Sequence, residues 1–160
     1  MESQVVTSIA FSKDEAQISV RHIEDKPGIA AAIFGPLADA NINVDMIVQN
    51  ITPDGKKTDM TFTVQAGELP RALAVLKQAQ ADIGHFDIKS SVDVVKISVI
   101  GVGMRSHAGV AAKMFKTLSD KGINIHAIST SEIKISVLID AAYAELAVRS
   151  LHTAYGLDSD

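Results

Sequence analysis

The chain has 160 residues, 47% of them hydrophobic and 21% charged, with a formal net charge of −4 at pH 7. This is the composition of a soluble globular protein of one domain or two small ones, without the basic surface that nucleic-acid binding requires. Cysteine is absent, which excludes disulfides, thiolate zinc sites and cysteine nucleophiles. No apolar run is long enough to span a membrane and no signal-peptide pattern is visible, so we expect a cytoplasmic protein.

The first half of the chain alternates strand and helix patterns. Residues 5–11 and 16–23 have the alternating polarity of strands, and an Asp-Lys-Pro-Gly turn then leads into a helix. The apolar stripe of this helix is expected at Ala30, Ile33, Phe34 and Leu37. Strands follow at 42–51 and 59–66, then a helix opened by residues 68–70 and a short strand at 85–90. From residue 16 onward the order is β-α-β-β-α-β, the ferredoxin-like module.

The second half predicts the same order with one strand missing. A strand at 93–103 precedes a helix from about His107, strands at 123–130 and 133–139, and a helix with Asp140 as its expected N-cap. No fourth strand follows, whereas residues 5–11 are one strand in excess. We therefore expect an α+β protein in which the first module, 15–91, is inserted in a second module made of 5–11 and 92–155. The alternative is that residues 5–11 form a free edge strand.

The two halves also repeat in sequence. Residues 28–44 and 109–125 share eight identities in seventeen positions, where unrelated sequences share roughly one. Gly28 aligns with Gly109 and Asn43 with Asn124. A repeat of this length indicates two copies of one supersecondary unit.

Each repeated turn–helix junction is a candidate site for a free amino acid. A helix N-terminus presents backbone N–H groups and partial positive charge to a carboxylate, provided that small residues such as Gly28 and Ala30 leave it open. Asp25 could meet the ammonium group. Asn43 and Asn124 are expected beside the same loops. The alternative is that the glycines and asparagines serve only tight turns.

The stretches IEDKPGIAAAIFGPLADANINVDMIVQN and GMRSHAGVAAKMFKTLSDKGINIHAISTSEIKISVLI resemble the paired ACT domains of the aspartate kinase regulatory region. The resemblance covers residues 5 to 155, and ISTSEIKISVLI is specific to that family. It implies a chain without catalysis of its own, the regulatory part of an ATP-dependent phosphotransferase acting on aspartate. The implied function is feedback inhibition, by threonine and by lysine as a second candidate, of the first step of amino-acid biosynthesis from aspartate. A homodimer through the ACT domains, with effectors at the interfaces, and contact with a kinase domain or alpha subunit are also implied.

The resemblance further implies which residues bind the effectors. Ala108 stands where the family usually has proline, and His126 stands where lysine-sensing relatives often carry an acid, which favours threonine. The first site would use Asp25, Gly28, Ile29, Ala30, Asn43, Asp45 and Gln49, and the second Met104, Ser106, His107, Gly109, Val110, Asn124, Ile125, Thr130, Ser131 and Glu132.

Other chemical readings of the sequence are weaker. GVGMRSHAG at 101–109 lacks the third glycine of a dinucleotide loop, and no P-loop pattern for ATP occurs. The five histidines have no metal-binding spacing, so neither cofactor nor metal is expected. Residues 129–132 are either a hydroxyl-lined pocket wall or a turn between strands. A free-standing ACT adaptor that regulates another protein is the alternative function. A nucleic-acid-binding ferredoxin-like domain would need aromatic residues and a basic face that the chain lacks.

Overall fold

The computed structural model describes residues 6–101 and 107–157. Its elements, in chain order, are β1 Val6–Ser12, β2 Glu15–Glu24, α1 Ile29–Asp39, β3 Asp45–Ile51, β4 Lys57–Gln65, the 3-10 turn η1 Ala66–Glu68, α2 Leu69–Ile83, β5 Asp87–Ser91, β6 Val94–Gly101, α3 His107–Asp120, β7 Ala127–Thr130, β8 Lys134–Asp140, η2 Ala141–Tyr143 and α4 Ala144–Ala154. Within these ranges no helix is long and apolar enough to cross a membrane.

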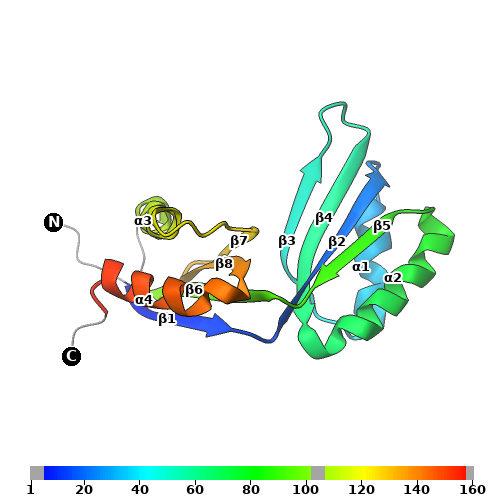
Figure 1. Ribbon diagram of the computed structural model, residues 1–160. Coiled ribbons are helices and arrows are strands. Elements are labelled where there is room, and N and C mark those ends of the chain that lie inside the picture. Colours follow the sequence, from blue (N-terminus) through cyan, green and yellow to red (C-terminus); the bar gives the residue numbers. More distant parts are fainter. Residues whose placement is uncertain (1–5, 102–106, 158–160) are drawn as a thin grey trace. The chain divides into compact units, whose positions relative to one another are not determined.

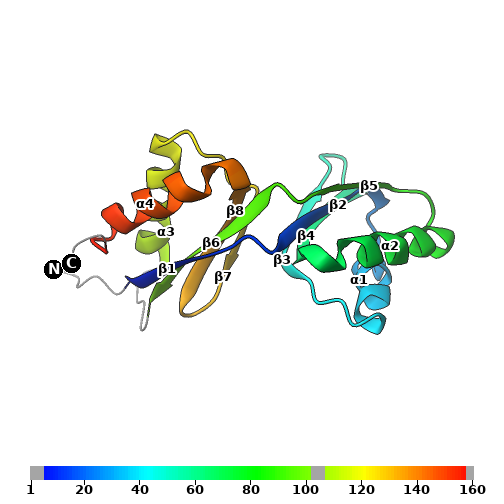
Figure 2. The same ribbon diagram turned by 60° about the horizontal axis from the view of Figure 1, so that its bottom comes forward.

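The chain forms two compact units. Asp14–Val92 make up one, here called the inserted unit, and Met1–Lys13 together with Asp93–Asp160 make up the other, the split unit. Each unit has one four-stranded antiparallel sheet with two helices on one of its faces (Figures 1 and 2). Both are ferredoxin-like βαββαβ modules of mixed α+β class, which confirms the fold class predicted from the repeat.

In the inserted unit the strands lie in the order β3-β4-β2-β5 (Figure 1). The predicted alternation is confirmed on the helix-covered face, where β2 and β4 place apolar side chains that are at most 2% exposed: Ala16, Ile18, Val20, Met60, Phe62 and Val64. α1 packs on them through Ile29, Ile33 and Leu37, at i, i+4 and i+8. Ala30, which was predicted in the stripe, is exposed instead, because α1 begins at Ile29 and turns that residue inward.

In the split unit the order is β1-β6-β8-β7, so the strand nearest the N-terminus is an edge of a sheet whose other strands lie beyond residue 93 (Figure 2). β1 runs antiparallel to β6, from Val6 opposite Gly101 to Ser12 opposite Lys96. Six fully buried side chains of β6 and β8 form the sheet's contribution to the core: Val95, Ile97, Val99, Ile135, Val137 and Ile139.

Three predicted element boundaries were wrong. The strand expected at 42–51 begins at Asp45, and the one expected at 123–130 begins at Ala127. The helix expected from Asp140 begins at Ala144 after η2. Asp140 does precede η2 but makes no side-chain cap, because its carboxylate instead bonds the imidazole of His126, with 2.7 Å between Oδ1 and Nε2.

The sheet face away from the helices repeats a hydroxyl pair. The hydroxyl oxygens of Ser19 on β2 and Thr61 on β4 lie 2.9 Å apart. Those of Ser98 on β6 and Ser136 on β8 lie 2.7 Å apart. Ser19 and Ser98 are the central residues of an identical Ile-Ser-Val stretch, at 18–20 on β2 and at 97–99 on β6. Because each hydroxyl satisfies the other, both pairs can stay largely buried at little cost in free energy. The repeat therefore extends beyond the helices to polar contacts between strands.

Candidate functional site

The mouth of the inserted unit is the loop between β2 and α1. Gly28 is the N-cap residue of α1, with φ 89° and ψ −7° in the left-handed region, and no side chain caps the helix. A Cβ placed on Gly28 would have no atom within 4 Å. Glycine is thus required there by the backbone conformation and not by crowding. The space in front of the helix end is open.

The backbone of this mouth is held at both ends. The carbonyl oxygen of Gly28 accepts a bond from the N–H of Ala32 at 3.0 Å, and the carbonyl oxygen of Lys26 accepts one from Ile29 at 3.2 Å. Ile29 is buried, whereas Ala30 and its neighbour Ala31 are exposed with only a methyl group each. The first turn of α1 is therefore anchored in the core and unshielded on its outer side. A carboxylate can approach a helix end of this kind.

Asp25 is placed at the same mouth by a bond to the neighbouring hairpin. Its backbone N–H donates to the carbonyl oxygen of Lys56 at 2.9 Å, in the turn between β3 and β4. The residue is half-buried, three positions before Gly28. A carboxylate and a helix N-terminus are thus close in the chain on one open loop. This arrangement provides opposite charges for the two ends of a zwitterion.

Gln49 lies on the edge strand β3, level with Val20 near the middle of β2. It pairs with Met60, and its Nε2 donates to the Oγ1 of Thr58 at 3.1 Å. Thr58 is fully buried and in turn donates to the carbonyl oxygen of Asn50 at 3.3 Å. The amide of Gln49 is therefore oriented by a fixed hydroxyl while the residue remains exposed.

Asn43 and Asp45 lie at the other end of the inserted unit. Asp45 on β3 and Gln17 on β2 both pair with Thr63 of β4, whereas the mouth comes after Glu24 at the end of β2. Seven strand residues separate these levels, which is about 23 Å at roughly 3.3 Å per residue. The expectation that Asn43 lies beside the Gly28 loop was wrong, because β3 runs parallel to β2 and so begins where β2 begins.

The second predicted mouth lies partly outside the described residues. Met104 and Ser106 are outside them, as is the side chain of His107, with which α3 begins. Gly109 is the third residue of α3, whereas its sequence counterpart Gly28 is an N-cap. Val110 follows in the first turn and is half-buried.

Thr130, Ser131 and Glu132 form the hairpin between β7 and β8. The N–H of Ser131 donates to the carbonyl oxygen of Lys134 at 2.8 Å, so of the two alternatives a turn is present. The next residue, Ile133, accepts a bond from the N–H of Gly101 at 2.8 Å. The hairpin therefore lies at the end of β6 from which the chain leads to α3, as the Lys56 hairpin does in the inserted unit.

Asn124 and Ile125 are again at the far end of their unit. They precede Ala127, and Ala127 and Lys96 both pair with Leu138 of β8. Lys96 lies five strand residues, about 16 Å, before Gly101. Neither asparagine thus completes the mouth of its own unit. The neighbouring His126 is held by Asp140, so a carboxylate is present beside the position where the resemblance led us to expect little negative charge.

Tyr155 ties the end of α4 to the first turn of α3. Its hydroxyl donates to the carbonyl oxygen of Val110 at 2.6 Å, and the ring is 2% exposed. The ammonium group of Lys113 lies 5.2 Å from the ring centroid. Burial raises the pKa of Tyr155 to about 12. Sequence analysis missed this residue because a lone tyrosine near the end of a chain carries no motif.

We expect Tyr155→Phe to lower the free energy of unfolding by about 1 kcal/mol, since the hydrogen bond from its hydroxyl to the carbonyl oxygen of Val110 is lost. In the unmodified chain, tyrosine ionises near pH 10 when unfolded and near pH 12 when folded. The stabilisation should therefore be complete below pH 10 and decline by about 1–2 kcal/mol toward pH 12. Urea titrations of both chains at pH 8, 10 and 12 measure the difference. An equal loss in both chains would contradict the assignment.

No group of three or more His, Cys, Asp or Glu residues is arranged to hold a metal ion within 6–101 and 107–157. The groups at the mouth of the inserted unit are instead backbone amides and the carboxylate of Asp25. Such groups bind small polar organic molecules by hydrogen bonds and charge.

Comparison with known proteins identifies both units as members of one domain class. The ACT domain family matches residues 15–81 of the inserted unit and residues 97–155 of the split unit.

Full-length matches then define the family. The chain is 54% identical to a chain in the crystal structure of aspartokinase alpha and beta subunits, covering 95% of this chain and 99% of that one with a TM-score of 0.88. It is 43% identical to the ligand-free regulatory subunit of aspartate kinase from Thermus thermophilus, covering 94% and 98%, also with a TM-score of 0.88. The chain belongs to the aspartokinase family and corresponds to its regulatory, ACT-domain part.

Curated relatives are longer. Aspartokinase of Pseudomonas aeruginosa is 51% identical over 159 residues, and that of Helicobacter pylori strain 26695 is 52% identical over 158 residues. Each match covers 99% of this chain but 38% of the relative. The match is thus to the regulatory part, which is not itself catalytic.

Proposed function

We propose that the chain binds threonine as a feedback effector and thereby lowers the activity of an aspartate kinase catalytic part. The observation that carries this proposal is the open mouth of the inserted unit, where Gly28 precedes a helix without a side-chain cap and Asp25 lies three residues before Gly28. The α-carboxylate would lie at the N–H groups of the first turn of α1. The α-ammonium would lie at Asp25, and the hydroxyl of threonine is matched by the carboxamide of Gln49.

A second copy of the chain would complete the site. Within one unit the mouth and the asparagine are at opposite ends of the sheet, so we propose that an asparagine at a mouth comes from a second copy of the chain. Exposed isoleucines support pairing through the edge strands: Ile47 and Ile51 on β3 are 52% and 53% exposed, and Ile128 on β7 is 44% exposed. Edge strands with exposed apolar side chains are surfaces for pairing with another chain.

Dimerisation also provides the route to regulation. An effector bound between two copies stabilises the paired arrangement only to the extent that it binds this arrangement more tightly than the unpaired one. We propose that this paired state holds an associated kinase domain or alpha subunit in a less active form, in the cytoplasm. The match to a chain in a structure of alpha and beta subunits supports such a partner.

Lysine is the second candidate effector. An ε-ammonium group requires a carboxylate at the end of the pocket, and His126 occupies the position where lysine-sensing relatives often have one. Asp140, 2.7 Å from His126, provides a carboxylate nearby. The balance favours threonine, since the imidazole already occupies one oxygen of Asp140.

Isothermal titration calorimetry of the full chain with threonine and with lysine tests the proposal, with sedimentation of the same samples to follow dimerisation. We expect threonine to bind and to increase the dimer fraction. Asp25→Asn should weaken its affinity at least tenfold, because the charge opposite the ammonium is lost. Asp82→Asn, on the exposed side of α2, removes the same charge elsewhere and should bind as the unmodified chain does.

Gln49→Ala provides the second arm. It removes the carboxamide without changing charge, on an exposed position whose loss leaves the core intact. Unchanged threonine affinity in both Asp25→Asn and Gln49→Ala would rule out the mouth of the inserted unit as the site.

A further inference from the structure

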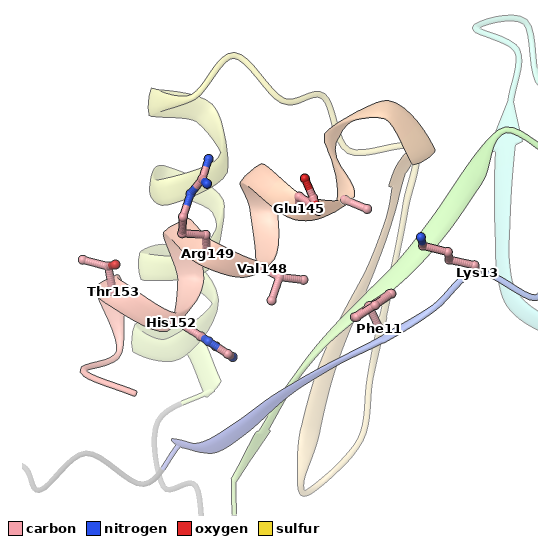
Figure 3. A pocket seen from close by; sticks show the side chains of 8 residues that line it. Phe11, Lys13, Glu145, Val148, Arg149, His152 and Thr153 are labelled. Atoms are coloured by element: carbon pink, nitrogen blue, oxygen red, sulfur yellow. The ribbon is translucent and has the colours of Figure 1, made fainter. Parts of the chain in front are cut away.

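A groove between β1 and α4 of the split unit has no role in the function proposed above. Its volume is about 510 Å³. Figure 3 shows the side chains that line it. None of its lining residues belongs to either mouth. They are Phe11, Lys13, Ala144, Glu145, Val148, Arg149, His152 and Thr153. Volumes of this size are typical of sites for small organic ligands.

The floor of the groove is apolar. Phe11 pairs with Ile97 and so projects from the helix-covered face of the sheet, yet it is 52% exposed. Figure 3 shows its ring directed toward α4, where Val148 projects toward β1. Ala144 is buried beneath. α4 thus leaves an aromatic face uncovered on one side of the groove, although burying it would be favourable by about 1.5–3 kcal/mol.

The rim of the groove carries more positive than negative groups. The ammonium group of Lys13 lies 5.8 Å from the centroid of the Phe11 ring. Arg149 and His152 are on α4, and among the described residues neither side chain has a hydrogen bond or an ion pair. Figure 3 shows the imidazole of His152 directed toward β1. Glu145 is the one carboxylate of the lining.

We propose that this groove binds a small amphipathic anion, in which one carboxylate or phosphate is attached to an apolar body. The apolar body lies on Phe11 and Val148 and covers the part of the Phe11 ring that α4 leaves exposed. The anionic group is held by the cations of the rim, and a charge-assisted bond to an otherwise unpaired guanidinium is among the stronger polar contacts. Glu145 would repel a second negative group, so monoanions are favoured over dianions.

Three probes of similar size separate these contributions in an NMR titration of the full, ¹⁵N-labelled chain. They are 4-phenylbutyrate, phenyl phosphate and the uncharged 4-phenylbutanol. We expect saturable shifts confined to the amides of β1 and α4. 4-Phenylbutyrate should bind at least fivefold more tightly than the alcohol and more tightly than the phosphate, which carries a larger charge.

Two variants test the contacts. Arg149→Gln should reduce the affinity for 4-phenylbutyrate about five- to tenfold and leave the alcohol unaffected, whereas Lys77→Gln, a matched exposed cation on α2, should change neither. Phe11→Ser should abolish saturable binding of all three probes. Because Phe11 is half exposed, we expect this variant to fold, and unchanged shifts in the inserted unit and on β8 would verify that.

Several results would overturn the proposal: an absence of saturable shifts on β1 and α4, equal affinities for the acid and the alcohol, or full affinity in Arg149→Gln. Tighter binding of phenyl phosphate would overturn the preference for monoanions. No arm of the experiment contains threonine or lysine, so failure here is independent of failure of the proposed effector site.

Discussion

A peptide of residues 93–160 is expected to be unfolded alone and to fold when a peptide of residues 1–13 is added. β1 pairs with β6 over its whole length and contributes Val6, which is 6% exposed, to the core of the split unit. Without β1, the edge of β6 and the apolar side chains beside it are open to water. A module of this size has little stability to spare, so losing one of four strands should exceed its margin.

The inserted unit supplies the control. A peptide of residues 14–92 contains all four strands of its sheet and its own core, and it should fold alone. Circular dichroism and ¹H–¹⁵N spectra of each peptide, and of the 1–13 and 93–160 mixture, measure the outcome. A folded 93–160 peptide without its partner would show that β1 is dispensable, and an unfolded 14–92 peptide would show that the inserted unit depends on the rest of the chain.

Phe62→Ala is expected to lower the free energy of unfolding of the inserted unit by about 3–5 kcal/mol. The side chain is fully buried, and its ring meets that of Phe34 edge to face, with 5.1 Å between centroids and 72° between planes. The substitution removes this contact and leaves a cavity in the core of the inserted unit. For a unit of marginal stability this change approaches complete unfolding.

The transition of the split unit should be unaffected, because Phe62 belongs to the other core. Urea unfolding followed by NMR intensities from each unit distinguishes the two transitions. Val92→Ala, at a position that is 55% exposed, is the apolar control and should change stability by less than about 0.5 kcal/mol. Equal destabilisation of both units by Phe62→Ala would mean that they unfold as one.

Much of the fold could be predicted because its determinants are local. Alternation in residues 16–23 identified the buried face of β2. The excess strand at 5–11, with no fourth strand after 139, led to the prediction that residues 5–11 belong to the second module. Boundaries were less accurate: residues 42–44 and 123–126 continue the apolar pattern of their strands but make no ladder pairs. Hydrophobic pattern reports burial, whereas strand ends depend on pairing with another segment.

The candidate site was predictable in its residue types but not in its assembly. Gly28 and Asp25 are neighbours in sequence and remain neighbours in space. Asn43 also lies in the repeated segment, but the parallel direction of β3 and β2 carries it to the far end. Such a separation depends on the course of a whole strand, which no motif encodes. The groove at Phe11 could not be predicted from the sequence either, because its lining residues on β1 and α4 are more than 130 positions apart.

The insertion of one unit within the other determines the order in which the chain can fold during its synthesis. β1 is made before the whole of the inserted unit, and the 81 residues from 13 to 93 separate it from β6. The inserted unit can therefore reach its native state on the ribosome while the segment of β1 is still unpaired. Slow translation between residues 93 and 140 would prolong this interval and give the unpaired strand time to join a neighbouring nascent chain.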